Sequence, residues 1–117
     1  MTASQQDVIW FEDLSRSDVP LVGGKSASLG EMIKALTPKG IRVPPGFATT
    51  SHAYWHFMDE NGLRPRLQSL LADHAAGKLT LPATGSAIRA EILNATWPAR
   101  TADAIAAAYR ELGRRAK

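Results

Sequence analysis

Two short apolar runs are typical of β-strands, and most of the remaining apolar residues recur at helical spacing. Val8–Phe11 is closed by two acidic residues, and Phe47–Thr50 follows a Pro-Pro-Gly turn. Two strands of this length do not form an independently stable sheet, so they need each other, the helices, or strands from other sequence. The pattern predicts an α/β (α+β) fold that is mostly helical with short strands.

The first long helix is predicted from four apolar residues within Leu29–Leu36 that fall on one helix face. Ser28 and Glu31 have the spacing of a capping box, which predicts a helix start near Ser28. Pro38 and Gly40 are expected to end this helix.

Four further helical patterns follow, starting after Ser51, after Gly62, near Ile88 and after Pro98, with a loop expected over residues 77–85. The apolar residues that these stripes should bury are Leu29, Ile33, Phe57, Leu67, Leu71, Ile88, Ile92 and Ile105.

Composition limits the classes of protein that this chain can represent. Its 117 residues make one domain, which is short for an enzyme that must hold a nucleotide and a second substrate, so a fragment of a larger protein is possible. The net charge of +3 lies wholly in the basic C-terminal residues after position 109, which argues against nucleic-acid binding. The absence of cysteine excludes disulfides and Cys-ligated zinc.

Residues 1–7 are interpreted as a flexible leader without a signal peptide. No segment is apolar over a length that could span a membrane, so we expect a cytoplasmic protein.

The histidines and tryptophans have structural interpretations that we favour over functional ones. His52 and His56 are spaced as two metal ligands could be, but without cysteine and with few acidic neighbours they are better interpreted as exposed residues. His74 lies on a leucine stripe, which is typical of a core or rim position. The three tryptophans do not alternate with basic residues, so they are expected in cores or interfaces. No metal ligands are predicted in this chain.

The glycine pair Gly23-Gly24 followed by Lys25 is the segment most suggestive of ligand binding. Glycines let a ligand approach the backbone, a helix start offers free N–H groups to an anion, and the lysine adds a positive charge. The segment is not a P-loop, since that motif requires a glycine where this chain has Val19. From these residues alone, both a structural turn and a phosphate site remain open.

Two linked motifs carry a resemblance to a known family. Val22-Gly23-Gly24-Lys25 through Leu29-Gly30-Glu31-Met32, then Val43 to Thr50, resemble the N-terminal region of the phosphoenolpyruvate synthases, within the PEP-utilising enzyme family. The resemblance covers the chain from about Val8, and pyruvate phosphate dikinases and rifampin phosphotransferases share the same opening.

The resemblance implies that residues 8–117 are the incomplete N-terminal part of an ATP-binding domain, the first subdomain of an ATP-grasp-like fold. In that family ATP phosphorylates a histidine on another domain, and the phosphohistidine then serves pyruvate. The overall reaction converts ATP, pyruvate and water into AMP, phosphoenolpyruvate and phosphate with Mg²⁺. Lys25 maps onto the lysine that contacts ATP phosphates, with Gly23 and Gly24 closing on the nucleotide, whereas Pro44–Phe47 should brace the neighbouring strand.

Several parts of that machinery have no counterpart in this chain. The Arg-Ser-Ser motif, the Mg²⁺ ligands, the phosphorylated histidine and the pyruvate site of the family are not found in these 117 residues. We therefore expect no catalytic residue here and no catalysis by this chain alone, with the remaining domains of the parent enzyme as its partners. The alternatives are a fragment of a rifampin phosphotransferase or of a pyruvate phosphate dikinase, and a stand-alone, non-catalytic module that binds a nucleotide or a protein partner.

Overall fold

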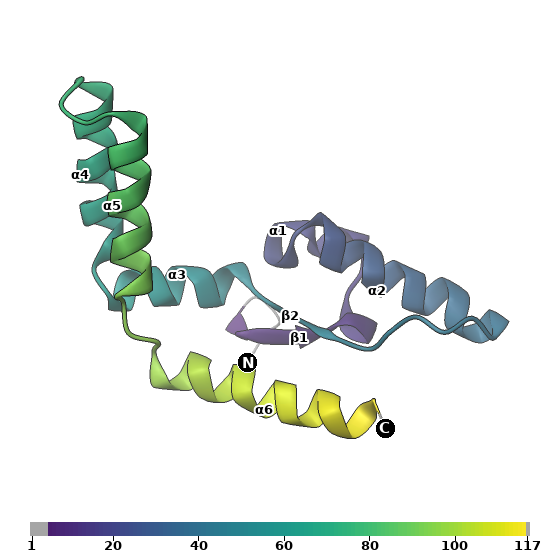
Figure 1. Cartoon of the computed structure of the whole chain (residues 1–117). Coiled ribbons are helices and arrows are strands. Elements are labelled where there is room, and N and C mark those ends of the chain that lie inside the picture. Colours follow the sequence, from purple (N-terminus) through teal and green to yellow (C-terminus); the bar gives the residue numbers. More distant parts are fainter. Residues whose placement is uncertain (1–4, 117) are drawn as a thin grey trace. The chain divides into compact units, whose positions relative to one another are not determined.

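The computed structural model describes residues 5–116, which fall into two compact units (Figure 1). The first unit contains described residues 5–54 and 99–116, and the second contains residues 55–98. The elements of the first unit are β1 (Val8–Trp10), the 3₁₀ turns η2 (Phe11–Asp13) and η3 (Arg16–Asp18), α1 (Val19–Val22), α2 (Gly24–Leu36), the 3₁₀ turn η4 (Thr37–Lys39), β2 (Phe47–Thr49) and α6 (Ala99–Arg115). The second unit contains α4 (Leu63–Ala75) and α5 (Leu81–Leu93), while α3 (Ser51–Glu60) begins in the first unit and ends in the second.

The two strands predicted from the sequence form one antiparallel sheet. β1 pairs with β2 in the register Val8 with Thr49, Ile9 with Ala48 and Trp10 with Phe47. The backbone pairing continues past β1, because the Phe11 N–H donates to the Gly46 carbonyl oxygen at 3.0 Å. This bond confirms that the Pro-Pro-Gly-Phe segment braces the neighbouring strand. The predicted mixed fold, mostly helical with short strands, is also confirmed.

The core of the first unit is small and centres on Leu14, which is fully buried. Ile9 and Ala48 pack with it from the sheet, and Leu21 lies partly buried against the cluster. Helix α2 approaches this core closely at Gly30, where an added Cβ atom would lie 2.7 Å from the Cβ atom of Leu14. The glycine therefore sets how closely α2 packs on the segment before it.

Helix α2 begins four residues before the predicted start. Its first residue is Gly24, with Gly23 as the N-cap, so Ser28 lies inside the helix and the predicted capping box is wrong. Glu31 instead accepts a hydrogen bond from the Arg16 N–H at 2.8 Å. The positive φ of Gly23 (85°) lets α1 end and α2 begin without a linker, a geometry that capping-box spacing does not reveal.

Two of the residues predicted to be buried are exposed. Leu71 on α4 is 53% exposed and Ile92 on α5 is 39% exposed. The two helices pack through one face each, with Leu63 and Leu70 buried on α4 and Thr84 buried on α5. The predicted stripes are wider than the surface that the partner helix covers, so their flanks remain in contact with solvent.

The predicted helix boundaries also need correction in the second half of the chain. α5 begins at Leu81, within the expected loop, because the Thr80 hydroxyl oxygen accepts a hydrogen bond from the Ala83 N–H and Pro82 suits the first turn. It ends at Leu93.

Candidate functional site

The start of α2 leaves backbone donors free at a position without side-chain bulk. The first bond of the helix runs from the Ala27 N–H to the Gly23 carbonyl oxygen at 3.1 Å, so the three N–H groups of residues 24–26 have no partner within the helix. Gly23 has no side chain with which to cap them. A Cβ atom added at Gly23 or Gly24 would meet no atom within 4 Å. This helix end can therefore accept an anion at close range.

Lys25 is exposed in the first turn of α2, next to these donors. Among the described residues no carboxylate forms an ion pair with it. Its ammonium group is thus available to an anionic ligand, in the place where the sequence predicted it.

A cavity of about 290 Å³ runs along the first two turns of α2. Its lining residues come from η3, α1 and one face of α2: Arg16, Val19, Gly24, Ala27, Ser28 and Glu31. The glycine pair contributes one residue to this lining. Arg16 and Glu31, which sequence reasoning did not assign to a site, contribute its charged groups.

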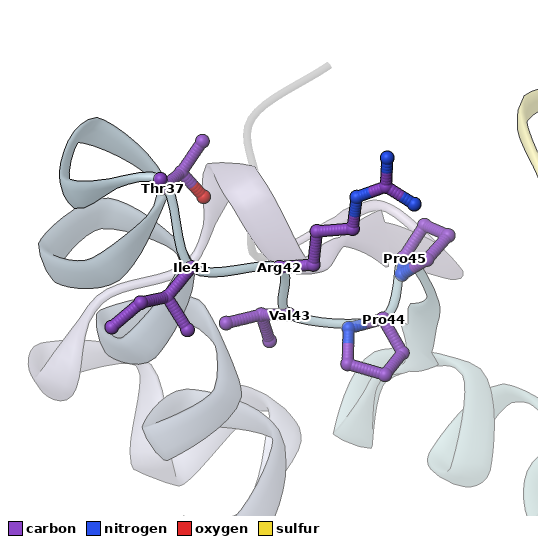
Figure 2. Close-up of a pocket in the computed structure, with 7 residues that line it drawn as sticks. Thr37, Ile41, Arg42, Val43, Pro44 and Pro45 are labelled. Atoms are coloured by element: carbon purple, nitrogen blue, oxygen red, sulfur yellow. The ribbon is translucent and has the colours of Figure 1, made fainter.

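A second cavity, of about 510 Å³, lies in the loop that leads to β2 (Figure 2). It is lined mainly by apolar side chains, together with Arg42, and the full set is Thr37, Gly40, Ile41, Arg42, Val43, Pro44 and Pro45. It has no cluster of polar groups that would orient a substrate, so it is a weaker candidate than the α2 start.

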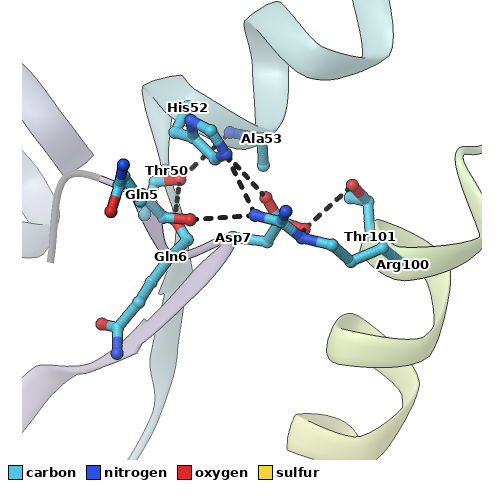
Figure 3. A network of polar contacts seen from close by, with 8 residues as sticks. All are labelled: Gln5, Gln6, Asp7, Thr50, His52, Ala53, Arg100 and Thr101. Carbon is cyan, nitrogen blue, oxygen red and sulfur yellow. Dashed lines mark hydrogen bonds and ion pairs between the residues drawn. The ribbon is translucent and has the colours of Figure 1, made fainter. Parts of the chain in front are cut away.

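Among the described residues, the buried charged group is Asp7, whose side chain is 2% exposed (Figure 3). The Thr101 hydroxyl donates to its Oδ2 at 3.0 Å, and Arg100 Nε lies 3.5 Å from the same oxygen. His52 Nε2 is 3.8 Å from Oδ1, which accepts no hydrogen bond among the described residues. These contacts join the start of β1, α3 and α6, and we interpret them as structural.

The expected leader, residues 1–7, ends in this network. Residues 1–4 lie outside the described residues, whereas the Gln5 carbonyl oxygen accepts a hydrogen bond from Arg100 and the Gln6 carbonyl oxygen accepts one from the Thr50 hydroxyl. Asp7 was missed as a buried residue because an acidic side chain in a polar segment predicts solvent exposure.

His74 and Trp55 have local structural contacts. The Nδ1 atom of His74 lies 3.0 Å from the Leu79 carbonyl oxygen, and the Arg64 guanidinium pairs with Asp59 while stacking over Trp55. In residues 5–116 no group of three or more His, Asp or Glu side chains is placed to hold a metal ion. None of the helices in this range is long and apolar enough to cross a membrane.

Comparison with known proteins identifies the family. The family model "Pyruvate phosphate dikinase, AMP/ATP-binding domain" matches residues 19–117, which include the glycine pair and Lys25. The chain belongs to this family. The family description names AMP and ATP as the nucleotides that this domain binds.

Relatives of the chain are phosphoenolpyruvate synthases. Identity is 46% over 103 residues with that of Synechocystis sp., covering 87% of this chain and 13% of the relative. It is 47% over 106 residues with the enzyme of Neisseria meningitidis serogroup B, covering 90% of this chain and 13% of the relative. The Escherichia coli enzyme is 41% identical over 106 residues, again covering 90% and 13%. The chain therefore spans about an eighth of the length of these relatives.

Proposed function

We propose that this chain supplies one wall of the ATP site of a phosphoenolpyruvate synthase, as the first subdomain of an ATP-grasp-like domain. The whole protein would convert ATP, pyruvate and water into AMP, phosphoenolpyruvate and phosphate through a phosphohistidine. The observation that carries this proposal is the uncapped start of α2 beside Lys25, in a chain of the AMP/ATP-binding family.

The chemistry of the helix start suits a phosphate group. The backbone N–H groups of residues 24–26 point out of the helix end, and the positive end of the helix dipole adds to the charge of Lys25. Phosphoryl transfer depends mainly on positioning and charge neutralisation, which these groups provide without covalent chemistry. ATP supplies the phosphoryl group when bound, while Gly23 and Gly24 keep the approach to the donors open.

The rest of the proposed machinery lies in other domains of the parent protein. As the family resemblance implies, the Mg²⁺ ligands are expected in those domains and not in this chain. The phosphorylated histidine and the pyruvate site are assigned to the same missing domains, and no catalytic residue is assigned here. We place the parent enzyme in the cytoplasm, where ATP and pyruvate are available.

Titration of the chain with ATP, followed by amide NMR, tests the proposed site. We expect the largest shifts at residues 24–26, and we expect Lys25→Ala to weaken ATP binding. A hydrogen bond to a charged group contributes roughly 1.5–3 kcal/mol, so the loss should be about 10- to 150-fold. The matched control is Lys34→Ala, which removes an exposed lysine from the last turn of the same helix and should leave the affinity unchanged.

The outcomes separate the proposal from its alternatives. Equal loss in both lysine variants would indicate general charge attraction, and no ATP shift at residues 24–26 would contradict the proposed site. In the parent enzyme, Lys25→Ala should impair histidine phosphorylation by ATP and spare exchange between phosphoenolpyruvate and pyruvate. Equal damage to both half-reactions would contradict a role confined to the nucleotide site.

A further inference from the structure

Glu31 connects α2 to the segment that leads into the glycine pair. The N–H of Arg16, fifteen residues earlier in the chain, donates to Glu31 Oε1 at 2.8 Å. Glu31 is seven residues after Gly24, so it lies on the same helix face, about 10 Å along the axis. Both residues line the 290 Å³ cavity beside the helix start. The bond therefore fixes one wall of that cavity to the other.

The segment from Ser15 to Gly23 is ordered by its own bonds, so a restraint at Arg16 can act on the glycine pair. The Ser15 N–H donates to Asp18 Oδ2 at 2.9 Å, and the Asp18 N–H donates to the Ser15 carbonyl oxygen at 3.0 Å. The Gly23 N–H then donates to the Val19 carbonyl oxygen at 2.8 Å, which closes α1. Glu31 supplies a side-chain hydrogen bond between this segment and α2, whereas the bonds from Ser15, Asp18 and Gly23 are local.

We propose that Glu31 is a positioning residue for the nucleotide site, holding Arg16 so that the turn at Gly23 keeps the donors of residues 24–26 aligned for phosphate. This inference rests on the proposed function. Glu31 acts through the backbone of Arg16 and touches no phosphate itself, since its charge would repel one. Loss of the bond lets the turn at Gly23 adopt several arrangements. The affinity for ATP then falls in proportion to the fraction of molecules whose turn still has the arrangement that binds phosphate.

A purely structural role for Glu31 makes a different prediction. The bond lies at the surface, where water can replace the carboxylate as the partner of the Arg16 N–H, so its loss should barely change global stability. Ligand affinity and local hydrogen exchange should respond more strongly than the unfolding midpoint does. That difference is what separates positioning of the site from support of the fold.

The test compares Glu31→Ala with Glu31→Gln, whose amide oxygen can still accept the bond. Hydrogen exchange at the Arg16 amide should accelerate in Glu31→Ala and stay slow in Glu31→Gln. The dissociation constant for ATP, measured by NMR titration, should rise about three- to tenfold in Glu31→Ala and return close to the unsubstituted value in Glu31→Gln. Glu60→Ala, at an exposed position on α3, is the control and should leave both readouts unchanged.

Each outcome bears on a separate claim. If Lys25→Ala weakens ATP binding and Glu31→Ala does not, the positioning role is overturned and the proposed function stands. Equal weakening in Glu31→Gln and Glu31→Ala also overturns it, because the acceptor would then be irrelevant. If Lys25→Ala has no effect, the proposed function fails. If Glu31→Ala unfolds the chain, Glu31→Gln still decides. The positioning role requires that the exchange rate of its Arg16 amide and its affinity for ATP both match those of the unsubstituted chain.

Discussion

Gly30→Ala should destabilise the first unit, although the same change usually stabilises a helix. An alanine Cβ atom at this position would lie 2.7 Å from the carbonyl oxygen of Leu14 and 2.8 Å from that of Phe11. Ordinary carbon–oxygen contacts in proteins are about 3.3–3.6 Å, so α2 must move away by roughly 0.5–1 Å. A side-chain rotation cannot relieve contacts with backbone oxygens, and the fully buried Leu14 would lose packing as the helix moves.

The size of the effect follows from two opposing contributions. Overpacking of a core costs about 1–3 kcal/mol, and replacing a helical glycine by alanine returns about 0.5–1 kcal/mol. We therefore expect Gly30→Ala to lower the free energy of unfolding by about 1–2 kcal/mol, measured from urea denaturation curves followed by circular dichroism. The expected loss is a large fraction of the stability of a domain of this size.

Gly113→Ala provides the matched control within the same unit. Gly113 also lies in a helix, α6, but an added Cβ atom there meets nothing within 4 Å. Its replacement should raise the free energy of unfolding by up to about 1 kcal/mol. Equal unfolding midpoints for the two variants would refute the argument that contact with Leu14 and Phe11 sets the position of α2.

Three further predictions address burial, charge and activity. Thr101→Val should lower the free energy of unfolding by about 1–3 kcal/mol, because it removes the hydrogen bond to the buried Asp7 carboxylate; unchanged stability in urea denaturation would contradict this. Hydrogen bonds from Arg114, and to a smaller extent from Arg115, lower the pKa of the Glu111 carboxyl. The ionised carboxylate therefore stabilises the folded chain at pH values above the ordinary pKa, and this stabilisation is lost as the pH falls through the lowered pKa. In a carboxyl NMR titration, Arg114→Ala should raise the pKa of Glu111, and an unchanged midpoint would show that the bond does not form in solution. The chain incubated with ATP, Mg²⁺ and pyruvate should form no more AMP than a heat-killed control, and pyruvate-dependent AMP above that level would overturn its assignment as a non-catalytic part.

Local sequence patterns correctly predicted which segments form the strands and where a helix follows the glycine pair. The two strands predicted from Val8–Phe11 and Phe47–Thr50 pair with each other, since β-prone residues flanked by turns have little alternative. The glycine pair was also assigned to a helix entry, and α2 follows it directly. The role of Lys25 in nucleotide binding stays a prediction, because no ligand contact tests it.

Prediction failed where the role of a side chain depends on which groups lie beside it in the folded chain. Glu31 was assigned to a capping box from its spacing to Ser28, but its carboxylate bonds to Arg16 instead. Asp7 is buried because Thr101, Arg100 and His52 surround its carboxylate, and nothing near it in the sequence indicates that. Leu71 was predicted to be buried and is exposed. Helical spacing shows which apolar residues share a helix face, but not how much of that face another helix covers.

The first unit is discontinuous in the chain, and this imposes an order on its assembly during protein synthesis. Asp7 bonds to Thr101, 94 residues later, and Glu12 pairs with Arg115, 103 residues later. Ribosomes add about 5–20 residues per second, so β1 waits roughly 5–20 s before α6 is made. In that interval the Asp7 carboxylate remains hydrated, while α4 and α5, which are adjacent in sequence, can already pair. Slowing translation within residues 55–98 would lengthen the time during which the N-terminal strand is exposed to other nascent chains and to proteases.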